Sequence, residues 1–87
     1  MRVKILGSAT ALTTTGSTIS SSTDVFISHD SGGNQARTVT LTEDDGTVVG
    51  SYMSSPGTVL VINKHADQKL KIDAGNDVKA TPVAYIS

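Results

Sequence analysis

The sequence predicts an all-β fold, a small antiparallel β-sandwich or barrel of about seven to eight short strands. Thr, Val and Ile supply 27 of the 87 residues, and side chains branched at Cβ suit a pleated strand better than a helix. Turn signals recur about every 8–12 residues, which is the spacing typical of sandwiches and barrels. No segment shows the apolar repeat of an amphipathic helix.

The length and composition indicate one β domain over residues 1–87 with a thin core. The chain has one Phe, two Tyr, no Trp and no Cys, so it lacks both the side chains that bury most area and a disulfide framework. Small domains of this kind gain stability by oligomerising or by docking on a partner. We therefore expect a homo-oligomer or copies bound to a larger assembly.

The first half of the chain is read as strands separated by polar turns. Residues 2–6 alternate cationic and apolar side chains, and residues 24–29 place Val25, Ile27 and His29 on one face. The segment DSGGNQ is predicted to be a loop. Residues 37–42 alternate Thr with Val39 and Leu41. The EDDG sequence then predicts a hairpin turn.

The second half continues the pattern. Residues 47–53 form the return strand, in which Gly50 indicates a bulge or a close backbone approach. After the SSPG turn, the apolar run 58–63 predicts a strand buried on both faces. The KHADQ segment suggests a single helical turn before a strand at 70–73. The last strand, 78–87, contains Pro82, which predicts an edge strand or a bulge there.

A run rich in hydroxyl side chains covers residues 10–23, where ten of fourteen residues are Thr or Ser. Its two isolated apolar residues, Leu12 and Ile19, are typical of a segment pinned to a sheet rather than of a linker. The run is either a solvated face or a docking face for another subunit. In the second case, docking would order residues 1–23 on the partner.

No motif for catalysis, metal binding or nucleic-acid binding stands out. His29 and His65 each have an aspartate nearby, Asp30 and Asp67, but no nucleophile-elbow sequence is present. The acidic turns at 43–45 and 73–77 are explained by turn conformation, although their oxygens could hold Ca²⁺. The basic residues Lys64, His65, Lys69 and Lys71 are diluted by Asp67 and Asp73. We therefore predict a non-enzymatic protein without cofactor or metal.

The net charge of −1 gives no electrostatic signal for nucleic acid or an anionic membrane. The N-terminal apolar run stops at Leu6, too early for a secretory signal, and no stretch approaches the roughly 20 apolar residues of a membrane span. We expect a protein that is made and kept soluble, with no membrane or nucleic-acid partner.

Three stretches carry a resemblance to a known group of proteins: KILGSATALTTTGSTISSSTDVFI, the stretch from TVTLTEDDGTVVGSY to NKHADQKL, and VKATPVAYIS. The pattern resembles small virion structural proteins of tailed phages, notably phages of marine cyanobacteria. The resemblance rests mainly on Pro56-Gly57, Lys64, Asp67, Leu70 and the closing residues 78–85. It implies a β-module attached to the particle, without enzymatic activity and made in the cytoplasm of the host cell.

Within a virion, the favoured position is the capsid surface, as a decoration or cement protein that binds the major capsid protein or other virion proteins. Many copies would turn weak contacts into strong attachment. A neck or tail component is the first alternative, and a surface-binding β-module on a fibre is the second. A small hydrolase built around His29 or His65 is the third. The residues expected at the partner interface are Arg2, Lys4, Leu12, Thr13, Thr14 and Thr15.

Overall fold

A computed structural model describes residues 2–30, 35–75 and 77–86 and confirms the all-β prediction. The described chain forms eight strands: β1 (Arg2–Ile5), β2 (Thr10–Ala11), β3 (Asp24–His29), β4 (Arg37–Thr42), β5 (Val48–Ser54), β6 (Val59–Asn63), β7 (Lys69–Ile72) and β8 (Val78–Ile86). Residues 31–34 of the predicted DSGGNQ loop lie outside the described residues.

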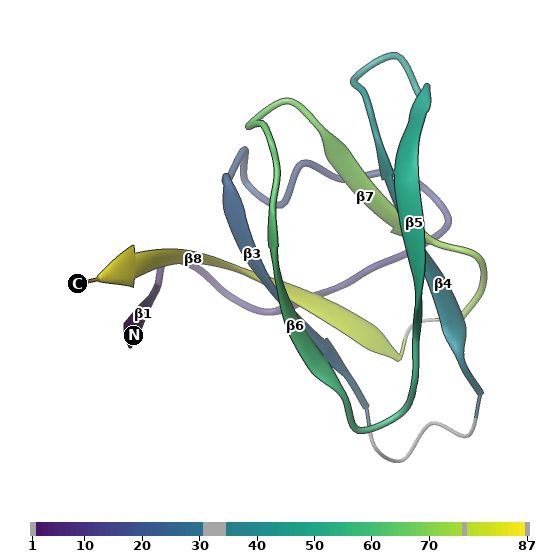
Figure 1. The fold of residues 1–87 in the computed structure, drawn as a ribbon, viewed down its shortest axis with the longest axis horizontal. Helices are drawn as coiled ribbons and strands as arrows, with labels where there is room; N and C mark the ends of the chain where they lie inside the picture. Colours follow the sequence, from purple (N-terminus) through teal and green to yellow (C-terminus); the bar gives the residue numbers. More distant parts are fainter. Residues whose placement is uncertain (1, 31–34, 76, 87) are drawn as a thin grey trace.

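The strands form two antiparallel sheets that face each other as a sandwich (Figure 1). The larger sheet has the order β1-β8-β3-β6, with the short β2 also paired to β8. The smaller sheet has the order β5-β4-β7. β8 is a central strand of the larger sheet, because it pairs with β1 and β2 along one side and with β3 along the other.

The core follows from the period-2 alternation of the strands. Val25 and Ile27 of β3 point between the sheets, and their partners in β8 include Ala80, which is also fully buried. From the smaller sheet, Val39 and Leu70 close the core from the other side. The predicted inward faces of β3 and β4 are therefore confirmed, and His29 lies on the same buried face of β3.

The Thr/Ser-rich run crosses from one sheet to the other and is held within the chain. Leu12 and Ile19 are 1% and 5% exposed and belong to the core cluster, as expected for anchoring residues. Between them, Ser17 exchanges two backbone hydrogen bonds with Leu70 of β7, at 3.1 and 2.8 Å. The Lys64 amide then bonds the carbonyl oxygen of Thr23 at 2.8 Å. These contacts join residues 12–23 to both sheets of the folded chain.

The predicted turns are present with the expected chemistry. In the 43–47 hairpin, the Gly46 amide donates to the Glu43 carbonyl at 3.0 Å, and Gly46 has a φ of 94°. Asp45 accepts the Thr47 amide through its carboxylate at 3.0 Å, an Asx turn that also lowers the pKa of Asp45. The register of β4 with β5 shifts next to Gly50, so the bulge prediction is confirmed.

Three sequence predictions need correction. β6 is an edge strand, with Val59 61% and Leu60 47% exposed, so the prediction of burial on both faces is wrong. The segment 64–68 forms a hydrogen-bonded turn and no helix. Pro82 lies in a strand paired on both sides rather than at an edge.

The irregularity expected at Pro82 occurs in the strands opposite it. Residues 6–9, between β1 and β2, span only two residues of β8, and the Leu6 amide donates to the Pro82 carbonyl at 2.9 Å. Because N and O of one strand residue point to the same side, the missing amide of Pro82 faces this looped stretch. No ladder hydrogen bond is lost there.

The end of β8 projects from the sandwich together with β1. The β3–β8 ladder ends at the Asp24–Val83 pair, so residues 84–86 pair only with residues 2–4 of β1. We call these six residues the arm. In Figure 1 the arm extends beyond the part of the larger sheet that faces the smaller sheet, and both chain ends lie near it.

Candidate functional site

Apolar side chains cover part of the solvent side of the larger sheet. Registers place Phe26 of β3 between Val61 of β6 and Thr81 of β8, and Ile5 of β1 beside Val83. Together with Val3, these residues line a shallow groove of about 370 Å³. We call this set the outer face: Val3, Ile5, Phe26, Val61, Thr81 and Val83.

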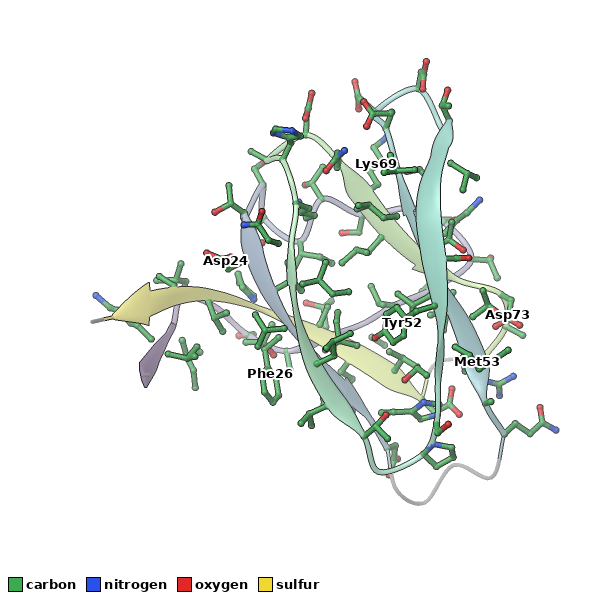
Figure 2. All side chains as sticks on the ribbon, viewed as in Figure 1. Asp24, Phe26, Tyr52, Met53, Lys69 and Asp73 are labelled. Carbon is green, nitrogen blue, oxygen red and sulfur yellow. The ribbon has the colours of Figure 1, made fainter. Side chains whose placement is uncertain are left out.

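The outer face arises because β3 is apolar on both sides. Val25 and Ile27 point inward, so the period of two turns Phe26 outward. Figure 2 shows the contrast: Tyr52 lies between the sheets, whereas Phe26 lies on the far side of β3 and β6 from it. Ile5 is 71% exposed at the edge of the face. A contiguous apolar surface of this kind is typical of an interaction site.

The predicted interface residues come from two parts of the fold. Arg2 and Lys4 lie in β1, and Lys4 is exposed. Thr13, Thr14 and Thr15 are exposed elsewhere, along the edge of β7, where the Thr13 carbonyl accepts the Ile72 amide at 3.0 Å.

Leu12 is a core residue, and its burial leaves it no exposed surface to offer a partner. Its inclusion in the interface is therefore corrected. The residues that the sequence reasoning missed are Phe26 and Val61 of the outer face. The available signal was the only Phe of the chain, placed at the outward position of a strand.

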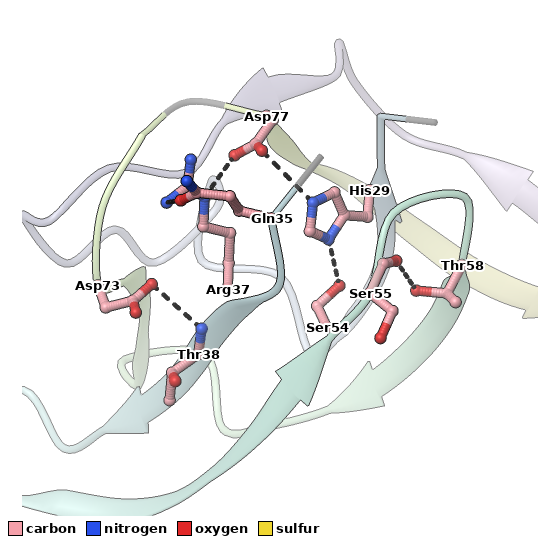
Figure 3. A network of polar contacts seen from close by, with 9 residues as sticks. All are labelled: His29, Gln35, Arg37, Thr38, Ser54, Ser55, Thr58, Asp73 and Asp77. Atoms are coloured by element: carbon pink, nitrogen blue, oxygen red, sulfur yellow. Dashed lines mark hydrogen bonds and ion pairs between the residues drawn. The ribbon is translucent and has the colours of Figure 1, made fainter. Parts of the chain in front are cut away.

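A polar network joins the two sheets at one end of the sandwich (Figure 3). His29 of β3 has its Nδ1 atom 2.9 Å from Ser54 Oγ of β5 and its Nε2 atom 3.5 Å from Asp77 Oδ2. Arg37, at the start of β4, donates from Nε to Asp77 Oδ1 at 3.0 Å. The network thus contains the residue types of a catalytic triad.

The neighbours of His29 favour one tautomer of its imidazole ring. A proton on Nε2 would point toward the carboxylate of Asp77, and Nδ1 would then accept the Ser54 hydroxyl; the opposite tautomer would place a lone pair against that carboxylate. The Arg37 hydrogen bond, assisted by the positive charge of Arg37, holds the pKa of Asp77 below its ordinary value. Asp77 is therefore a stable anion at neutral pH.

The network has the residue types of a catalytic triad, but its serine and histidine are buried away from any substrate. In a serine hydrolase, the hydroxyl must reach a substrate carbonyl. Here Ser54 is 2% and His29 is 4% exposed, and the serine bonds Nδ1 rather than Nε2 of the ring. The geometry fits a polar connection between the sheets: His29 Nδ1 is bonded to Ser54, while the buried Nε2 atom lies 3.5 Å from Asp77 Oδ2 and has no hydrogen-bond partner among the described residues.

The other candidate residues are engaged in turns. The Asp73 carboxylate accepts the Thr38 amide at 3.1 Å, and Asn76 lies outside the described residues. Lys64 is buried, with Nζ donating to the His65 carbonyl at 3.2 Å, and desolvation lowers its pKa. Lys69 pairs with Asp44 at 3.5 Å. In the described part of the chain, no group of His, Asp or Glu has the arrangement of a metal site.

Comparisons with protein-family models, curated proteins and solved structures give no significant match. Within the described residues, no helix is long and apolar enough to cross a bilayer.

Proposed function

We propose that this protein is a non-enzymatic structural component of a tailed-phage particle, and that it decorates and stabilises the capsid by docking its outer face on the major capsid protein. The observation that carries the proposal is the partly exposed apolar outer face, which continues from β6 across β3 and β8 to β1. The sequence resemblance to small virion proteins supports a virion protein as the partner.

The energetics of the fold support a role in an assembly. The core is built mainly from Val, Ile and Leu, with Tyr52 only packed against its side. The apolar groups of Ile5, Phe26 and Val61 remain in contact with water, and each exposed square ångström that a partner covers contributes about 25 cal/mol. Repetition over a capsid lattice would multiply this modest contact.

A neck or tail position remains the alternative, because the same outer face could dock on any virion protein. The number of bound copies separates the two positions. A decoration protein binds a head in hundreds of copies if it occupies most lattice sites, whereas a neck or tail ring holds only a few.

The experiment mixes purified protein with undecorated phage heads, pellets the heads and counts the bound copies on a quantitative gel. Two variants form a matched pair: Ile5→Asp on the outer face and Val48→Asp on the smaller sheet. Ile5 is 71% and Val48 60% exposed, so neither change disturbs the core. We expect Ile5→Asp to lose binding and Val48→Asp to keep it. Equal binding by both variants would contradict docking through the outer face, and binding only to tails would contradict the capsid position.

A further inference from the structure

β1 is an edge strand with an open row of backbone hydrogen-bonding groups. It pairs with β8 on one side, and the Leu6 amide bonds the Pro82 carbonyl within that register. Bonded positions alternate in an antiparallel ladder, so Lys4 faces β8 with its amide while Val3 and Ile5 face the open side. Two amides and two carbonyls are therefore available to a further strand.

The side chains of β1 indicate which residue types would suit an added strand. Val3 and Ile5 belong to the outer face, so residues paired with them would lie on the same apolar surface. Lys4 points to the other side and makes no salt bridge among the described residues. A residue opposite Lys4 would be favoured if it were acidic.

A second copy of this chain is a poor occupant of this edge. Antiparallel pairing of two β1 strands that sets Val3 opposite Ile5 places Lys4 opposite Lys4 of the other copy, and pairing that sets Val3 opposite Val3 places Lys4 opposite Arg2. Like charges directly opposite destabilise a strand pair, and lysine at an edge strand is a known means of preventing self-association. The positive charges of β1 therefore disfavour its pairing with β1 of a second copy of the chain.

We propose that β1 receives an extended segment of the partner protein in which apolar and acidic residues alternate, adding a strand to the larger sheet. The backbone groups of Val3 and Ile5 hold the added strand, its apolar side chains extend the outer face, and a carboxylate of the strand pairs with Lys4. The arm gains most, because a ribbon of two strands is marginally stable in water and a third strand stabilises it.

This inference rests on the proposed docking function and specifies its recognition mode. It predicts that a proline in β1 at an outward-facing amide blocks binding without breaking the existing ladder. Val3→Pro removes one such amide. The matched control is Val59→Pro: in β6, the Lys64 amide bonds the Thr23 carbonyl within the β3 register, so by alternation the Val59 amide also faces an open edge of the same sheet.

The probe is a fluorescein-labelled peptide of sequence Thr-Glu-Val-Glu-Val-Glu-Val-Thr, and a second peptide replaces each Glu by Lys. Fluorescence anisotropy is measured with the wild-type chain and the variants. We expect the acidic peptide to bind at least about tenfold more tightly than the lysine peptide. Val3→Pro should weaken binding by about tenfold or more, Val59→Pro should leave it unchanged, and Lys4→Glu should reverse the preference between the two peptides, with each factor of ten equal to about 1.4 kcal/mol.

The outcomes distinguish this inference from the proposed function. Absence of acidic-peptide binding, or equal effects of the two prolines, overturns strand addition at β1 even if heads are still bound. Binding of the peptide without binding to heads overturns the capsid role alone. If sedimentation shows a wild-type dimer that Val3→Pro abolishes, the occupant is a second copy and the acidic partner is wrong. If Val3→Pro lowers the urea midpoint, Lys4→Glu supplies the decisive comparison.

Discussion

Replacing Leu12 by alanine tests whether the Thr/Ser-rich run is part of the folded core in the free protein. Leu12 is 1% exposed, packs in the core cluster, and its amide bonds the Val78 carbonyl at 2.8 Å. Truncating a buried leucine to alanine costs roughly 2–5 kcal/mol. We expect about 3 kcal/mol, because the small core of this sandwich leaves few neighbours able to fill the cavity.

The loss is large relative to the stability of a domain of this size. At about 0.05–0.15 kcal/mol per residue, the 87 residues give a total of roughly 4–13 kcal/mol. A loss of about 3 kcal/mol should lower the melting temperature by more than about 10 °C.

The assay is urea and thermal unfolding of the two variants Leu12→Ala and Thr14→Ala, followed by circular dichroism. Thr14 is an exposed neighbour in the same run, so its change should alter the free energy of unfolding by less than about 0.5 kcal/mol. If Leu12→Ala behaved like Thr14→Ala, the run would not be anchored in the core, and the account of residues 12–23 would be refuted.

Two further predictions concern the polar network and the glycines. Because the folded pKa of Asp77 is depressed, the stability that its carboxylate contributes is complete above the unfolded pKa of about 3.9 and is lost as the pH falls through the folded pKa. Between about pH 5 and pH 2, the urea midpoint should therefore fall less in Asp77→Asn than in the wild type. Parallel curves of urea midpoint against pH for the two proteins would exclude this role of Asp77. Gly7→Ala should destabilise the fold, because the added Cβ would lie 2.9 Å from Pro82 Cγ, whereas Gly50→Ala meets nothing within 4 Å and should be neutral or stabilising; equal melting temperatures would contradict this packing.

Local patterns in the sequence were sufficient to predict most strands and turns. The alternation in residues 24–29 identified Val25 and Ile27 as inward-facing, and both are buried. Asp45-Gly46 and Pro56-Gly57 identified two turns in which each glycine adopts a positive φ. These features depend on neighbours in the sequence, which is why they can be predicted without knowing the strand order.

Strand order could not be predicted, and the errors about β6 and Pro82 follow from it. Residues 59–63 look like a central strand because every side chain but the last is apolar, but only their position at the edge beside β3 decides their exposure. Pro82 suggests an edge strand, but β8 is paired on both sides. The sheet tolerates this proline because its missing amide faces the looped residues 6–9.

The candidate sites depend on contacts between distant residues. The outer face needs β1, β8, β3 and β6 to be neighbours, and only the fold places Ile5 beside Val83. Sequence proximity associated His29 with Asp30, whereas the structure places His29 between Ser54 and Asp77. Leu12 was expected both to anchor its segment and to contact a partner, and its burial leaves only the first role.

Backbone amide hydrogen exchange, compared between the free protein and the protein bound to phage heads, tests the docking account most directly. The account predicts slower exchange on binding in residues 2–6 and in β3 and β6 around the outer face, with the 43–47 hairpin unchanged. Protection confined to the hairpin and β5, with residues 2–6 exchanging as fast as in the free protein, would contradict docking through the outer face and β1.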